Sequence, residues 1–145
     1  MQIVEAQALT TQNNFQNGSE VAQIVFRFGK LSIWVRDVKE AIILLVEFDC
    51  IHGFRVLDER DQMEYWPVCS SQNGWLFEIF SGGWLSQEKD RPGSFVADMN
   101  PMAQEYFISG VDDCVSIISS VNPTIRSVGS IEQPQTDDLS PHSSE

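Results

Sequence analysis

Basic side chains and histidines are scarce in this chain of 145 residues. Nine Lys and Arg stand against 21 Asp and Glu, giving a formal net charge of −12, and only two His occur. A nucleic-acid-binding surface needs a cluster of cations to neutralise phosphates, so the composition argues against nucleic acid as a partner. It also argues against an anionic membrane surface. The excess of acid favours a basic protein partner, or serves solubility alone.

The familiar catalytic motifs are absent as well. The sequence contains no GxSxG, GxxxxGK[ST], HExxH or strand-linked GxGxxG pattern. Cys50 and His52 would share one face of a strand, but no oxyanion donor or third group accompanies them. We therefore assign no catalytic residues and favour a protein that is not an enzyme, with an enzyme of an unrecognised class as an alternative.

Cysteine is rare, and its pattern excludes the usual cysteine chemistry. Cys50, Cys69 and Cys114 are odd in number and form no CxxC pair, and no secretory signal pattern precedes them. This indicates a reducing, cytoplasmic location in which each Cys is a small buried hydrophobe. Because His52 and His142 are the only histidines, we expect no metal site, and no cofactor is indicated.

Hydrophobic runs are short. Residues 41–48 include seven apolar side chains in eight positions, far fewer than the roughly 20 residues of a membrane-spanning helix. The run shows neither strict alternation nor a helical stripe, so both of its faces must be buried. Its length and its Val, Ile and Phe content favour a central strand, and a buried helix beginning near Asp37 is the alternative.

Several β-rich segments are separated by tight turns. Residues 21–28 and 31–36 flank Gly29-Lys30, which is typical of a hairpin. In the second arm, Leu31, Ile33 and Val35 share one face, which places Trp34 on the other face with the polar residues. Trp34 is therefore expected to be partly exposed or covered by another element.

The second half of the chain gives further β signals. Residues 75–80 and 84–88 flank Gly82-Gly83 and predict a second hairpin. Residues 105–110 and 114–119 predict either another hairpin or one long strand with a bulge at Gly110.

Helical signals are few. Residues 58–66 predict one short helix, with Asp58 as its cap, Asp61 as the acidic arm of a capping box, and Pro67 at its end. Residues 95–97 predict a short strand or a buried connection. Asn100-Pro101 predicts a single helical turn.

The fold predicted from these elements is α+β and predominantly β. Strands that follow each other through tight turns favour antiparallel pairing, so we expect a twisted antiparallel sheet or a partly closed barrel or sandwich with one or two short helices. An N-terminal segment with a Gln/Asn-rich loop covers residues 1–20, and one globular domain covers residues 21–126. Residues 127–145 are rich in Ser, Pro, Gln and Asp and are predicted to be a disordered acidic tail.

One predicted site is an acidic, aromatic face that binds a basic protein. Carboxylates at three-residue spacing would form a stripe on a helix, and Trp is common among the residues that dominate protein interfaces. The predicted partner-binding residues are Asp58, Glu59, Asp61, Glu64, Trp66 and Trp34. An alternative is a small-ligand-binding β domain with a pocket lined by His52, Trp75, Trp84 and Phe95. A third interpretation is a self-associating domain with an exposed strand edge, which would form homo-oligomers.

A wider pattern links these segments to known proteins. Gly53-Phe54-Arg55-x-Leu57-Asp58-Glu59-x-Asp61-x-x-Glu64-Tyr65-Trp66 is followed by Gly82-Gly83-Trp84 and by Glu105-Tyr106-Phe107-Ile108. Over residues 20–125 the chain resembles small acidic bacterial proteins of unassigned function. In size, charge and aromatic content it is similar to immunity proteins of polymorphic toxin systems. That similarity implies a non-enzymatic module that blocks a basic toxin, and it transfers no residue role because such proteins share no catalytic residues.

Overall fold

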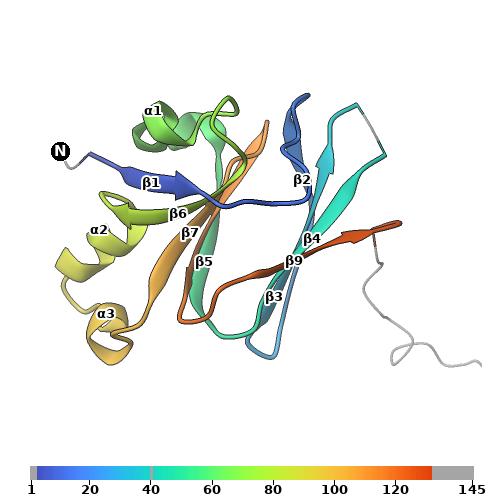
Figure 1. Cartoon of the computed structure of the whole chain (residues 1–145). Helices are drawn as coiled ribbons and strands as arrows, with labels where there is room; N and C mark the ends of the chain where they lie inside the picture. The colour runs from blue at the N-terminus through green and yellow to red at the C-terminus, as the bar shows by residue number, and fades with distance from the viewer. Residues whose placement is uncertain (1–2, 40, 132–145) are drawn as a thin grey trace, which may run out of the picture.

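Two antiparallel β-sheets pack face to face in the computed structural model, which describes residues 3–39 and 41–131 (Figure 1). Sheet A contains, in spatial order, β1 (Glu5–Ala8), β6 (Leu76–Ser81), β7 (Gln104–Ile108), β8 (Asp113–Ser119) and β5 (Ile51–Asp58). Sheet B contains β2 (Ser19–Arg27), β3 (Lys30–Asp37), β4 (Ile43–Phe48) and β9 (Thr124–Val128). The predicted fold class, predominantly β and antiparallel, is confirmed in the form of an open sandwich.

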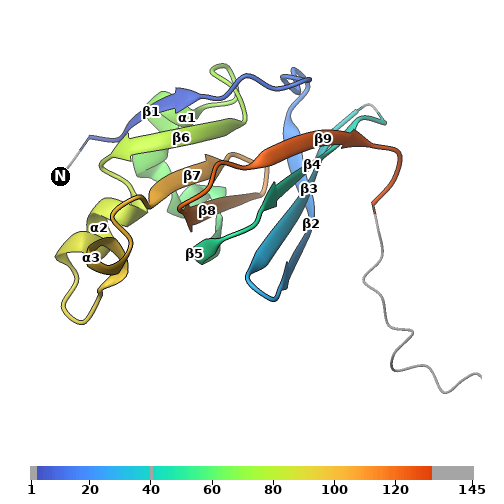
Figure 2. The same ribbon diagram turned by 60° about the horizontal axis from the view of Figure 1, so that its bottom comes forward.

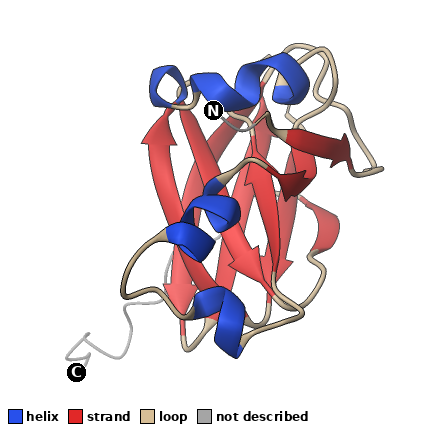
Figure 3. Ribbon diagram, turned by 90° about the vertical axis from the view of Figure 1, so that its left-hand side faces the viewer, coloured by secondary structure: helices blue, strands red, loops and turns tan. Residues whose placement is uncertain are grey.

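Short helical segments interrupt the strands of sheet A. The 3-10 turns η1 (Glu59–Asp61) and η2 (Met63–Tyr65) and the helix α1 (Trp66–Cys69) follow β5. Two further helices, α2 (Trp84–Asp90) and α3 (Val96–Met99), connect β6 to β7. Figure 3 looks onto this side of the molecule and shows the helices in front of the strands.

The apolar run at residues 41–48 forms β4, as the strand interpretation predicted. β4 lies between β3 and β9, and Leu44, Val46 and Phe48 point into the space between the sheets. Leu45 on the opposite face is also buried. The helix alternative for this run is therefore excluded.

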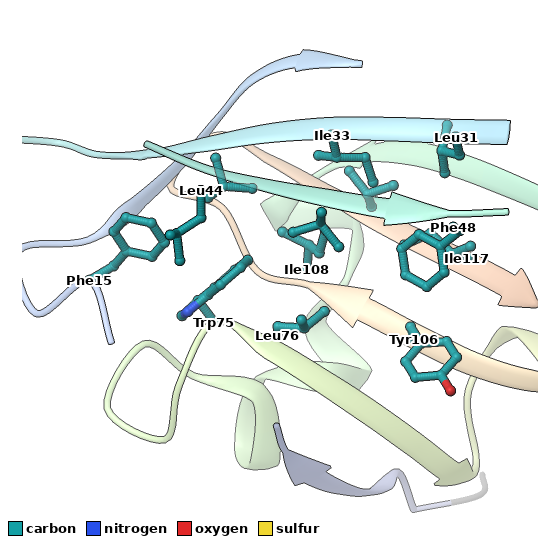
Figure 4. Packing of buried hydrophobic residues seen from close by; sticks show 13 residues of the cluster. Phe15, Leu31, Ile33, Leu44, Phe48, Trp75, Leu76, Tyr106, Ile108 and Ile117 are labelled. Carbon is teal, nitrogen blue, oxygen red and sulfur yellow. The ribbon is translucent and has the colours of Figure 1, made fainter. Parts of the chain in front are cut away.

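The main core fills the space between the two sheets (Figure 4). Side chains from β3 and β4 meet side chains from β6, β7 and β8, including Leu31, Ile33, Leu76, Tyr106 and Ile117. Each fully buried aliphatic side chain contributes roughly 1.5–3 kcal/mol to the stability of the fold. A second cluster lies on the other face of sheet A under the helical segments, so this sheet is covered on both sides.

The first predicted hairpin is confirmed, with its turn displaced by one residue. Arg27 pairs with Lys30, so Phe28 and Gly29 form the turn in place of Gly29-Lys30. Both turn residues have positive φ, +53° and +79°, as a two-residue hairpin turn of type I′ requires. Trp34 is covered on the outer face of sheet B, with 4% of its surface exposed.

The second predicted hairpin is wrong, because residues 84–90 form α2 and not a strand. A carboxylate from β7 supports the start of this helix. Glu105 accepts a hydrogen bond from the Leu85 N–H at 2.9 Å and so satisfies a free donor in the first turn of α2. β6 pairs instead with β1 and β7.

The helix predicted over residues 58–66 is broken into η1, η2 and α1. Asp58 does cap the segment, since its carboxylate accepts the Arg60 N–H at 2.9 Å. Pro67 was predicted to end the helix, and this is wrong. It lies in the first turn of α1, where its missing N–H leaves no bond unmade. The break places Gln62 and Tyr65 against sheet A, where both side chains are buried.

Residues 95–119 differ in part from the predicted elements. Residues 105–110 and 114–119 form the β7–β8 hairpin and not one bulged strand. The prediction of a strand or a buried connection at residues 95–97 is wrong, because Phe95 is exposed and Val96 and Ala97 begin α3. At Asn100-Pro101 the chain makes only a turn, closed by the Ala103 N–H on the Asn100 carbonyl at 2.9 Å.

The ends of the folded region extend past the predicted domain of residues 21–126. β1 belongs to sheet A, where Ala8 pairs with Phe77. β9 continues through Val128 and pairs with β4. Residues 132–145 of the predicted tail lie outside the described residues. In the described part of the chain, no helix has the length and apolar character needed to cross a membrane.

Candidate binding groove

Two acidic segments, distant in sequence, meet where β5 ends and β8 begins. Asp58 lies opposite Asp113 in the strand pairing, and the Glu59 N–H donates to the Asp112 carbonyl at 3.0 Å. We call the acids of these two segments, Asp58, Glu59, Asp61, Glu64, Asp112 and Asp113, the acidic cluster; Asp58 and Glu59 are the residues that join the segments. Antiparallel pairing creates this cluster, because it brings the turn before β8 against the end of β5.

Arg60 is the basic residue within the 58–64 segment of this cluster. Its Nε lies 3.1 Å from Asp58 Oδ1, and the side-chain hydrogen bond, together with the Arg60 N–H, lowers the pKa of Asp58. Both side chains are solvated, so the ion pair adds little to stability. Its main effect is to hold Asp58 ionised and to orient the first turn of the segment.

A groove of about 360 Å³ lies beside the acidic cluster, between α1 and the loops that precede β2 and join β7 to β8. This volume is at the lower end of the range of small-molecule and side-chain pockets. Its walls include Trp66, Cys69, Phe107, Gly110 and Val111, and Glu59 also lines it. An apolar surface bordered by carboxylates suits a ligand that is apolar in its body and cationic at one point.

Trp66 is the prominent aromatic residue of the groove. Its side chain is 45% exposed, and the indole Nε1–H donates to the Glu59 carbonyl at 3.0 Å. Pro67, the next residue, restricts the backbone at the start of α1. The indole is therefore held in place before any ligand arrives, which lowers the entropy cost of binding.

The structure places most of the predicted partner-binding residues together and leaves one apart. Asp58 ends β5, and Glu59, Asp61, Glu64 and Trp66 lie on the segment that follows it. They do not form a stripe on one helix, because the segment is divided between a cap, η1, η2 and α1.

Trp34 is separate from this face. It lies on sheet B, pairs with Leu45 and is almost fully buried, so its assignment to the partner-binding surface is corrected. The groove instead includes Val111 and has Asp112 beside it, two residues that lie between the predicted β segments 105–110 and 114–119 and were not predicted as site residues. The adjacent pair Asp112-Asp113 in a tight turn was the available signal, but its position against Glu59 depends on strand pairing.

The predicted ligand pocket is not assembled. His52 Nε2 lies 2.6 Å from Ser120 Oγ, and Trp75 is buried between the sheets with its ring centroid 5.1 Å from that of Phe15. Trp84 begins α2 and lies under the guanidinium of Arg55, whereas Phe95 is 66% exposed before α3. These four residues occupy separate environments, so they do not line a common pocket.

A buried polar network supports the groove from behind. The Tyr65 hydroxyl donates to Glu105 Oε2 at 2.5 Å and accepts the Trp84 N–H at 2.9 Å. Burial raises the pKa of Glu105, and burial and the Glu105 carboxyl raise the pKa of Tyr65. The Tyr65 ring stacks on Phe107 with the centroids 4.2 Å apart, and Phe107 is a wall of the groove. The network thus fixes both the start of α2 and one side of the groove.

The groove carries no activated thiol. Burial raises the pKa of Cys69 to about 12 and that of Cys114 to about 11, so both remain neutral thiols at physiological pH. Among the described residues, no group of three His, Cys, Asp or Glu is arranged to hold a metal ion. The residues that line the groove offer a ligand a carboxylate (Glu59), the hydroxyls of several Ser, and aromatic surface.

Comparisons with protein-family models, with curated proteins and with solved structures found no match. The resemblance to acidic bacterial proteins and to immunity proteins stays a prediction. Fold and groove geometry therefore carry the functional inference.

Proposed function

We propose that this chain is a non-enzymatic protein-binding module whose acidic cluster and groove receive a basic segment of a partner protein. The observation that carries the proposal is the meeting of residues 58–64 with Asp112 and Asp113 beside the groove that contains Trp66. In its most concrete form the partner is a toxin with a cationic active site, and this chain is its immunity protein.

In this proposal, charge and apolar contact act on different steps of binding. Solvated carboxylates attract a cationic partner over a distance and raise the association rate, an effect that salt screens. A fixed aromatic side chain in a groove acts mainly on dissociation, because it buries apolar surface once the partner has docked. Glu59 and Trp66 lie together, so both effects apply to the same segment of the partner.

Charge reversal tests the proposal. The double variant Asp61→Lys and Glu64→Lys changes two charges of the cluster, at an exposed position (Asp61) and a half-buried one (Glu64). We expect it to abolish capture of a basic protein from the lysate of the source organism. The wild-type chain should retain that protein at low salt and release it at high salt.

A matched control separates this effect from net charge. Asp90→Lys and Asp98→Lys make the same change in charge on exposed residues of α2 and α3. The control should retain the same protein, and its association rate, measured by surface plasmon resonance, should stay within about twofold of wild type, as for charges outside the contact. If the Asp61/Glu64 variant retains the basic protein as well as the control does, the acidic cluster is not part of the interface.

A further inference from the structure

Phe28 is an unusual residue for its position at the tip of the β2–β3 hairpin. Its φ is +53°, and 96% of its surface is exposed. Two-residue turns of this type normally use Asn, Asp or Gly, because a side chain with a left-handed backbone costs about 1–2 kcal/mol. The ring gains no burial in return. Within the described part of the chain, the contact with the Arg27 guanidinium offsets part of this cost but leaves the ring exposed, which points to a further contact outside the chain.

The residues around Phe28 define which groups a surface that binds the tip must accommodate. The Arg27 guanidinium carbon lies 5.9 Å from the centre of the Phe28 ring, and among the described residues Arg27 forms no ion pair. Phe26 is half-exposed and packs on Phe54, with the ring centroids 5.6 Å apart. Lys30 is already paired with Glu47 at 3.1 Å. The tip therefore presents an exposed aromatic ring next to a guanidinium that forms no ion pair with the described residues.

The groove has the complementary character and lies at the other end of the same strand. Ser19, the first residue of β2, lines the groove, and Arg27 is the last residue of β2. Nine residues of strand span about 30 Å, so the tip cannot reach the groove of its own chain. Figure 2 shows the β2–β3 hairpin projecting beyond the other strands, and Figure 1 shows its turn at the opposite end of the molecule from α1.

We propose that the groove of one copy receives the hairpin tip of a second copy. Phe28 enters between Trp66 and Val111, and Arg27 lies beside Glu59. The inference rests on the proposed function of the groove and names a second copy of this chain as its occupant. Because tip and groove are different surfaces at opposite ends of β2, a single contact is head-to-tail and can repeat into rings or open chains, whereas reciprocal insertion in an antiparallel pair gives a two-fold dimer.

The association is expected to be weak and reversible. A hairpin tip buries less surface than the roughly 1,600 Å² of a standard stable interface. The copies carry the same net charge of −12 and repel each other, but at physiological salt charges more than about 8 Å apart are screened. The direct contact between Arg27 and Glu59 keeps its attraction. A basic partner with higher affinity for the groove would displace the hairpin tip.

Sedimentation equilibrium of the full chain at physiological salt tests this contact. The average mass of the wild type should rise with concentration. Phe28→Ser removes the aromatic ring from the tip, and Trp66→Ala removes the indole from the groove. Each variant alone should therefore remain a monomer. Their equimolar mixture retains one intact groove and one intact tip per pair. The mixture should therefore reach twice the monomer mass and rise no further.

Controls make each outcome decisive. Phe80→Ser removes another exposed Phe, on β6, and should associate like the wild type. Glu59→Lys is a second groove variant, used if Trp66→Ala unfolds, and should also recover association when mixed with Phe28→Ser. A wild type that stays monomeric at every concentration, or a mixture that does not dimerise, overturns the proposal.

The proposed function is judged separately with the same proteins. Phe28→Ser has an intact groove, so it should still capture the basic partner when self-association is lost. Loss of capture in the Asp61/Glu64 variant bears on the acidic cluster alone. Failure of the head-to-tail contact is thereby distinguished from failure of partner binding.

Discussion

Burial divides the three cysteines into one accessible thiol and two protected thiols. Cys50 is exposed between β4 and β5, whereas Cys69 and Cys114 are buried together under the helical segments. The raised pKa values of about 12 and about 11 keep the two buried thiols protonated. A thiolate is the reactive form, so both burial and protonation suppress reaction.

We expect one thiol to be modified by a disulfide reagent in the native protein at pH 8 and three after denaturation. Mass spectrometry of the modified peptides should assign the native reaction to Cys50. The variant Cys50→Ser should show no native modification, while its two remaining thiols react once the chain is unfolded. Rapid native modification of Cys69 would show that the helical cover over sheet A opens readily.

Glu105 is a buried carboxyl group whose pKa is shifted by its surroundings. Its folded pKa is raised above the ordinary value of 4.5 by burial, although its hydrogen bonds to Tyr65 and Leu85 oppose that rise. The folded state therefore holds a proton more tightly at this site than the unfolded state. The contribution of this site to stability is fully present below pH 4.5 and is lost as the pH rises through the folded pKa.

Glu105→Gln should consequently gain stability relative to the wild type as the pH is raised from 4.5. The amide keeps the shape of the carboxyl and an oxygen for the Leu85 N–H, but it cannot ionise. The measurement is the free energy of urea unfolding at several pH values. Glu88→Gln is a control with the opposite sign, because the hydrogen bond from Arg91 lowers the pKa of Glu88. A pH-independent difference for Glu105→Gln would contradict the assignment.

At the scale of elements, α2 depends on a close approach between Gly83 and sheet A. A Cβ on Gly83 would lie 2.6 Å from Glu105 Oε1 and 2.8 Å from Tyr65 Oη. Gly83 has a φ of −100°, so its backbone is open to any residue and only space is limiting. The start of the helix is thus specified by packing against a buried polar network.

Gly83→Ala should destabilise the protein by about 1–3 kcal/mol, because it forces apart buried hydrogen bonds that solvent cannot replace. Urea unfolding followed by tryptophan fluorescence measures the change. Gly129→Ala is the matched control, since nothing lies within 4 Å of its added Cβ, and its effect should stay within about 0.5 kcal/mol. Equal stability of the two variants would show that α2 does not depend on this contact.

At the scale of the whole molecule, β2 joins the two surfaces proposed to bind. Its first residue, Ser19, lines the groove and donates a hydrogen bond to the Ser109 carbonyl of the β7–β8 loop, which attaches β2 of sheet B to that loop of sheet A. Its last residue, Arg27, leads into the exposed tip. The sandwich therefore holds an acidic groove and an aromatic tip at a fixed distance and at opposite ends.

Several features were determined by the sequence alone, because they depend on neighbouring residues. The apolar run at 41–48 had to be buried on both faces, and the alternation of Leu31, Ile33 and Val35 had to point one face of β3 inward. The acidic segment at 58–64 is local as well, and Asp58 caps it as its side-chain chemistry predicts.

Other features were decided only by the tertiary structure, because their causes lie far away in the chain. The helix at residues 84–90 begins on the carboxylate of Glu105, which no local pattern around Gly82-Gly83 reveals. Asp112 and Asp113 joined the acidic cluster through the pairing of β5 with β8. Local sequence sets which residues prefer to be buried or extended, but long-range pairing decides which side chains become neighbours, and the groove is made of such neighbours.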